Sequence, residues 1–157
     1  MLMSLDADHY LSRGDFPVFK KFDLTHVHHV NLLVRDIESA KREYRERFNI
    51  EFIDEKLPSR GAITSRFSLG ESWIVLVQPI AEGEPMRQLR ERGEGLFLLS
   101  LGVAQREKEA ASWSSLNTGI ISGLSEIRAG ISGWRVADFR ISGEPKGQLQ
   151  LAFPQND

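Results

Sequence analysis

Hydrophobic and polar residues along this chain follow two periods, and one succeeds the other without a gap. Val27 to Val34 is an apolar run interrupted on one face by polar residues, and Asp36 follows it at the position of a helix N-cap. From Ile37 to Phe48 the apolar residues recur at helical spacing, which predicts an amphipathic helix directly after a strand. Three short strands are expected next, at Ile50–Glu55, Ala62–Leu69 and Trp73–Gln78. The first part of the chain therefore predicts a β-α-β-β-β unit.

The same order of elements recurs in the second part of the chain. A strand, a polar helix and three further strands are expected, in that order, at Leu96–Val103, Gln105–Asn117, Gly119–Glu126, Trp134–Ile141 and Gln148–Phe153. Between the two parts, Pro85 favours the first turn of a short helix and Gly93 ends it. Tyr44 and Trp113 stand at the same offset in the two units, so the order is supported by a weak internal repeat.

Each unit covers one face of its sheet with a helix and leaves the other face open. Two such units side by side would curve the combined sheet into a cup, so the predicted fold is α+β. It has two tandem βαβββ modules that form a cup-shaped, curved mixed sheet with the helices outside. We assign residues 1–25 to an N-terminal extension and residues 26–157 to a single domain. Module one spans 26–80, the linking helix 84–93 and module two 95–154.

Composition narrows the function classes. The 157 residues are 41% hydrophobic and 27% charged, which is typical of a globular domain. A net charge of −2 gives no electrostatic reason to expect a nucleic-acid or membrane partner. The absence of cysteine excludes disulfides, thiolate metal ligands and cysteine nucleophiles. No apolar run reaches the roughly 20 residues of a membrane span, and the first residues lack a signal-peptide pattern, so we expect a cytoplasmic protein.

Three segments of the chain, in their order and spacing, resemble one protein superfamily. They are HVNLLVRDIESAKREYRERFNIEF, LGESWIVLVQP and RGEGLFLLSLGV. They are similar to the opening strand and helix, the end of the first module and the strand that opens the second module in the vicinal-oxygen-chelate superfamily. That superfamily includes glyoxalase I, methylmalonyl-CoA epimerase, the extradiol dioxygenases and the bleomycin-resistance proteins. The resemblance covers about Thr25 to Pro154, is nearest to the epimerase and glyoxalase branch, and implies a single glyoxalase-like domain.

The resemblance also implies where a divalent metal would bind, with one ligand from each of four strands. The matching positions here are His29, Val75, Leu98 and Gln150, where the superfamily commonly has His, Glu or Gln, His, and Glu. A catalytic metal needs about three protein ligands, and the valine and leucine side chains have no lone pair to donate. Gln150 is also unable to take a proton as a general base at neutral pH. We therefore predict no metal or other cofactor, treat the four positions as vestigial and assign no catalytic residue.

Strand alternation points further side chains into the predicted cup. The expected ligand-binding residues are His29, Asn31, Val75, Val77, Leu98, Ser100, Gln148 and Gln150. Apolar patches with a few neutral hydrogen-bonding groups match a pocket for an uncharged or weakly polar organic molecule. His26 and His28 lie on the other strand face and are expected to have packing or surface roles. A register slip of one residue would instead send His28 into the cup and His29 under the helix.

Three functions remain open from the sequence. The first is binding of a small organic molecule in the cup without a metal, by a homodimer. The second is a metal-dependent lyase or epimerase of the lactoylglutathione lyase or methylmalonyl-CoA epimerase type, in which His29 is kept and Glu94 or a partner's carboxylate is recruited. The third is a non-catalytic structural or interaction domain whose cup is filled by its own side chains. Whether a reaction occurs, as in the lyases, isomerases and dioxygenases of the superfamily, stays open.

Overall fold

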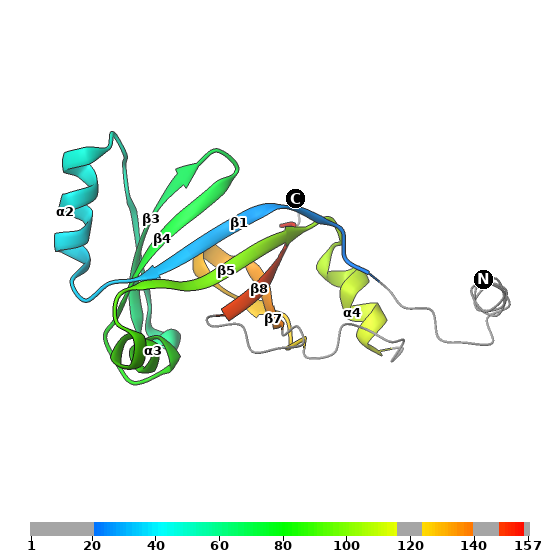
Figure 1. Cartoon of the computed structure of the whole chain (residues 1–157). Helices are drawn as coiled ribbons and strands as arrows, with labels where there is room; N and C mark the ends of the chain where they lie inside the picture. Colours follow the sequence, from blue (N-terminus) through cyan, green and yellow to red (C-terminus); the bar gives the residue numbers. More distant parts are fainter. Residues whose placement is uncertain (1–20, 116–123, 140–147, 156–157) are drawn as a thin grey trace, which may run out of the picture.

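A single curved sheet organises the molecule (Figure 1). The structure is a computed structural model that describes residues 21–115, 124–139 and 148–155. Within these ranges the sheet has eight strands in the order β2-β3-β4-β1-β5-β8-β7-β6. The strands are β1 (Leu24–Leu33), β2 (Ile53–Leu57), β3 (Ala62–Leu69), β4 (Ser72–Pro79), β5 (Gly95–Val103), β6 (Arg128–Ala129), β7 (Arg135–Phe139) and β8 (Gln148–Phe153). The helices are α2 (Ile37–Arg47), α3 (Glu84–Arg92) and α4 (Glu107–Ser115), with short 3-10 turns η1 (Pro58–Arg60) and η2 (Ile131–Gly133).

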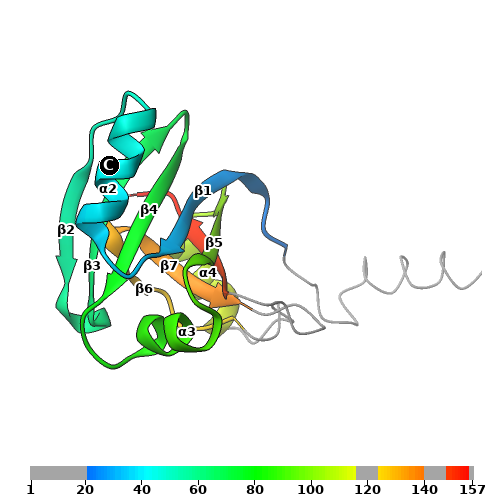
Figure 2. The same ribbon diagram turned by 60° about the vertical axis from the view of Figure 1, so that its left-hand side comes forward.

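The sheet consists of two similar halves that meet at its centre. β1 pairs parallel with β4, β5 pairs parallel with β8, and the antiparallel pairing of β1 with β5 joins the halves. The ribbon curls so that α2 and α4 lie outside it, at opposite ends of the sheet (Figures 1 and 2). This is the predicted α+β fold with a cup-shaped mixed sheet, and the fold prediction is confirmed, with α2 and α4 outside the cup and α3 packed against the inner cluster.

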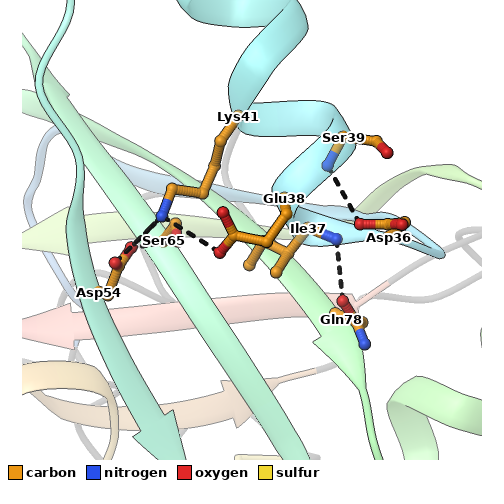
Figure 3. A network of polar contacts seen from close by, with 8 residues as sticks. All are labelled: Asp36, Ile37, Glu38, Ser39, Lys41, Asp54, Ser65 and Gln78. Carbon is orange, nitrogen blue, oxygen red and sulfur yellow. Dashed lines mark hydrogen bonds and ion pairs between the residues drawn. The ribbon is translucent and has the colours of Figure 1, made fainter.

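Helix α2 is fixed to the first half by polar contacts as well as by packing (Figure 3). The Asp36 carboxylate accepts a hydrogen bond from the Ser39 amide at 3.0 Å, which caps the helix as the sequence predicts. Lys41 is buried, and its ammonium group donates to both oxygens of Asp54 on β2 at 2.9 and 3.0 Å. Ser65 on β3 donates to the same carboxylate, so helix and strands share one polar anchor.

Apolar packing divides into two outer clusters and one inner cluster. Under α2, Val34, Ile37 and Leu76 are buried, and Tyr44 packs against them. Under α4 the outer cluster is Val103, Ala110, Ala137, Leu151 and Phe153. The inner cluster lies on the concave face and takes residues from both halves, among them Leu33, Val75, Val77, Leu98 and Trp134. Each half therefore has its own core beneath a helix, and the cup interior is shared between them.

Some predicted element bounds were wrong. The strand expected at Ile50–Glu55 is β2, which begins three residues later at Ile53. The strand expected at Gly119–Glu126 does not occur in its described part, because residues 124–127 are not in a strand and β6 comprises only Arg128 and Ala129. There the chain is held beside β7 by single contacts, such as the Ser125 amide donating to the Asp138 carbonyl at 2.8 Å. Residues 119–123, 116–117 and 140–141, in predicted strands or helix, lie outside the described residues.

None of the helices in the described ranges is long and apolar enough to cross a membrane.

Candidate functional site

The concave face of the sheet holds a pocket of about 80 Å³. Both halves line it: β1, β3 and β4 supply His29, Asn31, Thr64 and Val77, while β5, β7 and β8 supply Leu98, Val136 and Gln150. Pro85 at the start of α3 also lines the pocket, and Leu89 of that helix packs against the inner cluster. The pocket floor is therefore mainly apolar, with a few neutral polar groups.

The structure brings five of the eight predicted site residues to this pocket. His29, Asn31, Val77, Leu98 and Gln150 line it. Val75 and Ser100 lie on the same sheet face but are completely buried, and Gln148 is partly exposed and does not line the pocket. The strand register puts His29 beside Ser100 and Ser100 beside Gln150, so these three side chains form one row across β1, β5 and β8.

Three polar atoms around this floor are buried without a hydrogen-bond partner. They are Asn31 Oδ1, Ser100 Oγ and Gln150 Oε1, in residues that are at most 8% exposed. Leaving such an atom unsatisfied costs about 1–3 kcal/mol, so native proteins rarely do it without a reason. Two of the three, on Asn31 and Gln150, belong to residues that line the pocket.

His28 and His29 form a pair at the wall of the pocket. Their Nδ1 atoms are 2.8 Å apart, so one ring donates a proton to the other and at least one ring is neutral. Burial lowers the pKa of His29 to about 3, with the charge of His28 as the second cause. Burial likewise lowers the pKa of His28 to about 4, followed by the charge of His26. Both rings are therefore neutral near pH 7.

The position of His28 differs from the sequence prediction for a local reason. The pairing of β1 with β5 shifts register between Val27 and His29, as at a β-bulge, so adjacent side chains no longer alternate strictly. His29 stays in the cup, and His28 reaches the same tryptophan, Trp134, edge-on with ring centroids 4.7 Å apart. Besides the packing or surface role expected from the sequence, His28 therefore also contacts the wall of the cup.

Trp134 is the central side chain that the sequence analysis missed. Its ring lies 4.8 Å from the His29 ring and 6.0 Å from the Trp73 ring, between centroids. It follows η2, whose Ser132 amide donates to both carboxylate oxygens of Glu55 on β2, at 2.9 and 3.1 Å. A loop of the second half is in this way fastened to the far edge of the first half. Only the flanking glycines Gly130 and Gly133 marked this segment in the sequence.

Arginines at the pocket rim also escaped the sequence analysis. Arg60 of η1 and Arg128 of β6 both line the pocket. Arg128 pairs with Asp138 at 3.0 Å, whereas no ion pair or hydrogen bond of Arg60 occurs within the described residues. Burial lowers the pKa of Arg60, and the nearby positive charge of Arg128 is the second cause. The lining residues include no aspartate or glutamate in the part of the chain described, and Asp138, just outside the lining, is the one carboxylate that acts on both arginines there, so the rim has a net positive charge.

The four positions that the resemblance assigns to a divalent metal do not supply a suitable set of donors. Val75 and Leu98 offer only hydrocarbon, at 0% and 2% exposure, and Gln150 carries no charge to offset a cation. His29 already shares a hydrogen bond with His28. Elsewhere in the described ranges, no group of three or more His, Asp or Glu side chains is placed to hold a metal ion. These residues therefore do not fit the metal of the superfamily.

Glu94 does not replace the missing ligands. Its carboxylate pairs with Arg35 at 3.3 Å, both side chains are at least half exposed, and Glu94 does not line the pocket.

Comparison with known proteins finds similarity at the level of structure. No protein-family model matches the sequence, and no curated protein matches it. A methylmalonyl-CoA epimerase from Mycobacterium tuberculosis superposes with a TM-score of 0.69 at 17% identity, over 88% of this chain and 94% of that one. A hypothetical protein from Bacillus halodurans gives 0.67 at 21% identity, over 88% and 98%. A Streptomyces coelicolor methylmalonyl-CoA epimerase in complex with 2-nitronate-propionyl-CoA gives 0.65 at 18%, over 83% and 95%. The chain therefore shares the fold of these epimerases.

Proposed function

We propose that this protein is a vicinal-oxygen-chelate superfamily member that binds a small organic molecule in its cup without a divalent metal. The observation that carries the proposal is the pair of unpartnered, buried amide oxygens on Asn31 and Gln150, in residues that line an otherwise mostly apolar pocket floor. Neither oxygen is accessible to solvent as the side chains stand, so a ligand with a hydrogen-bond donor would pair with them after rotation of the amide groups toward the pocket.

The size of the cavity limits what enters it. At about 80 Å³ it has roughly half the volume of the ~150 Å³ apolar cavity that admits benzene. A few non-hydrogen atoms of a ligand therefore fit on the floor, and any larger remainder would extend through the mouth. Leu98, Val77 and Val136 provide the apolar contacts for that buried part.

His29 has a defined part in this proposal. With its pKa near 3 the ring is neutral, and its Nδ1 is engaged by His28, which leaves Nε2 to accept or donate one hydrogen bond. A neutral imidazole beside an aromatic ring binds an organic ligand without adding charge. We therefore include His29 among the ligand-binding residues with Asn31, Val77, Leu98 and Gln150, and propose indirect support from Val75, Ser100 and Gln148.

The test uses the native protein as purified. We expect native mass spectrometry and extraction to detect a small organic molecule, and metal analysis to find less than one ion per chain. His29→Ala is expected to weaken binding of the extracted molecule, read as a smaller rise in melting temperature, without altering metal content. His26→Ala is the matched control outside the pocket. A stoichiometric transition metal that is lost in His29→Ala would refute the proposal.

A metal-dependent lyase or epimerase is the second candidate, favoured by one observation. The fold match to methylmalonyl-CoA epimerases covers most of both chains, and one of them is a complex with an acyl-CoA compound. Its metal ligands would have to come from elsewhere than the four inherited positions and Glu94. Epimerase activity that depends on added metal would favour this candidate. The third candidate, a filled non-catalytic domain, predicts that no extracted or screened molecule raises the melting temperature.

Assembly as a homodimer and a cytoplasmic location complete the proposal. Large apolar side chains stand exposed at the ends of the two central strands, with Leu24 at 61% and Leu96 at 68% exposure. A second copy is a simple way to cover them. Sedimentation velocity of the purified chain tests the dimer.

A further inference from the structure

The charges around the pocket are unbalanced at its rim. Three cationic side chains approach the cup: Arg66 stacks over Trp73 and Trp134 and pairs with Glu55, and Arg128 pairs with Asp138. The third, Arg60, lines the pocket and has no ion pair within the described residues. Asp138 also attracts Arg60, so among the described residues Arg60 and Arg128 share one carboxylate and carry one net positive charge at the pocket.

The curl of the sheet brings the two rim arginines together. η1, which carries Arg60, connects β2 and β3 at one edge of the sheet, while Arg128 belongs to β6 at the opposite edge. Both line the same pocket, because the edges approach each other where Glu55 binds the η2 amide. Gly61 holds the end of η1 with a φ of +62°, and its carbonyl accepts from the amides of Ile80 and Ala81, so the turn that presents Arg60 is fixed.

The floor has the opposite chemical character. Asn31 and Gln150 on β1 and β8 carry unpartnered acceptor oxygens, and His29 beside them is neutral. The site therefore offers cationic donors at the rim and neutral acceptors at the floor. A molecule that satisfies both must carry an anionic group and a hydrogen-bond donor, a few atoms apart.

We propose that the ligand of this cup is a short organic acid, whose carboxylate is held at the rim by Arg60 and Arg128 and whose hydroxyl group donates to Asn31 or Gln150, or whose amino group donates to both. This inference rests on the proposed function and names its ligand class. A planar guanidinium fork matches a carboxylate with two parallel hydrogen bonds, which favours carboxylate recognition. A single negative charge also balances the net charge of Arg60, Arg128 and Asp138.

The experiment compares two probes of nearly the same shape. 2-Hydroxyisobutyrate has the carboxylate, the hydroxyl and an apolar body, and 2-hydroxyisobutyramide replaces one carboxylate oxygen with an NH2 group, so it loses the charge and one acceptor. Binding is followed by NMR titration of the tryptophan indole resonances. We expect the carboxylate to bind at least tenfold more tightly than the amide. Equal affinities, within about twofold, would overturn the inference, as would failure of the carboxylate to bind at millimolar concentration.

The variants test which arginine is responsible. Arg60→Gln breaks no ion pair among the described residues and should weaken carboxylate binding by roughly 10- to 100-fold, because a charged hydrogen bond is lost. Arg90→Gln is the matched control, since Arg90 pairs with Glu82 on the outer surface and does not line the pocket. Unchanged affinity in Arg60→Gln, or an equal loss in Arg90→Gln, would contradict the assignment. Inorganic phosphate is a third probe, and binding as tight as that of the carboxylate would also contradict it.

Failure of this inference is distinguishable from failure of the proposed function. If the neutral amide binds and Gln150→Leu abolishes that binding, the cup still takes small molecules and only the carboxylate assignment is wrong. If the native protein carries a stoichiometric metal on His29, the proposed function itself is wrong, whatever the probes show.

Discussion

The two halves of the sheet carry an ion pair at matching positions, with the charges exchanged. Val75 and Gln150 are equivalent in the internal repeat. On the neighbouring strand, Arg66 lies beside Val75 in the first half, and Asp138 lies beside Gln150 in the second. One strand further out, the partners are Glu55 and Arg128 respectively. β3 thus supplies the basic residue of the pair in the first half, and β7 supplies the acidic residue of the pair in the second half.

The exchange gives the two pairs different environments. The Arg66 side chain is only 8% exposed and lies over both Trp73 and Trp134, so the first pair is packed into the wall of the cup. In the second pair Arg128 stands on the edge strand, is 29% exposed and lines the pocket. One pair is therefore packed into the structure, whereas the other places a cation at the pocket. The same strand positions give different roles because the sign at each position differs.

Trp134 joins the second half to the buried ion pair of the first half, so its substitution has the largest expected effect. Trp134→Ala removes a ring that is 8% exposed and contacts His28, His29, Trp73 and Arg66. We expect a loss of about 3–5 kcal/mol in the free energy of unfolding, measured by urea denaturation. Leu69→Ala, at an exposed position outside the proposed dimer contacts, should change it by less than about 0.5 kcal/mol.

A loss below about 1 kcal/mol in Trp134→Ala would mean that the wall closes without this ring. The two halves would then be independent layers, and the difference between their ion pairs would have no structural consequence.

The sequence predicted the floor of the cup and not its rim. The fold and the floor residues follow from local periods, since alternation along a strand fixes which side chains share a face. His29, Asn31 and Gln150 were found in this way. The rim depends on how far the sheet curls, because Arg60 and Arg128 sit at opposite edges and meet only in three dimensions. No local sequence pattern specifies how close the two edges of the sheet come to each other.

The bulge in β1 and the short β6 were unpredictable for a related reason. A bulge is a property of two strands, and nothing in HVHHVN distinguishes a regular strand from one whose register shifts against β5. In the second half, the apolar residues Leu124 and Ile127 pack against the outer cluster under α4 without being part of a strand. Their apolar side chains therefore matched the sequence pattern expected of a strand. Tertiary packing decided both outcomes.

Protonation of the histidine pair is expected to have the second largest effect on stability. The pKa of His28 falls to about 4 and that of His29 to about 3 on folding, from an ordinary 6.5. Below pH 6.5 the unfolded chain therefore binds protons that the folded chain does not, and stability decreases as the pH falls toward 4. Between pH 7 and pH 5 we expect a loss of about 2–4 kcal/mol in urea denaturation.

The double variant His28→Gln, His29→Gln is expected to remove most of this dependence. The pKa values of Asp36 and Asp54 are lowered, chiefly by hydrogen bonds from Ser39 and Ser65, so these carboxylates titrate below the window. If the free energy of unfolding changed equally with pH in the wild-type protein and the double variant, other groups would cause the pH dependence. The histidine pair in the cup wall would then not be its source.

The smallest expected effect is the difference in coupling free energy between the two exchanged ion pairs. Double-mutant cycles with Arg66→Met and Glu55→Gln, and with Arg128→Met and Asp138→Asn, measure the coupling free energy of each pair by urea denaturation. We expect about 1–3 kcal/mol for the first pair, since Arg66 is buried between aromatic rings, and less than about 1 kcal/mol for the more exposed second pair. Glu55 also accepts a hydrogen bond from the Ser132 amide, so Glu55→Gln alone lowers the free energy of unfolding by more than the coupling free energy of the ion pair. The double-mutant cycle subtracts this extra loss. Equal coupling free energies, or a larger one for the second pair, would show that the difference in burial does not make the first pair stronger. Arg128 would then be a structural residue like Arg66, and its place at the pocket would need no ligand to explain it.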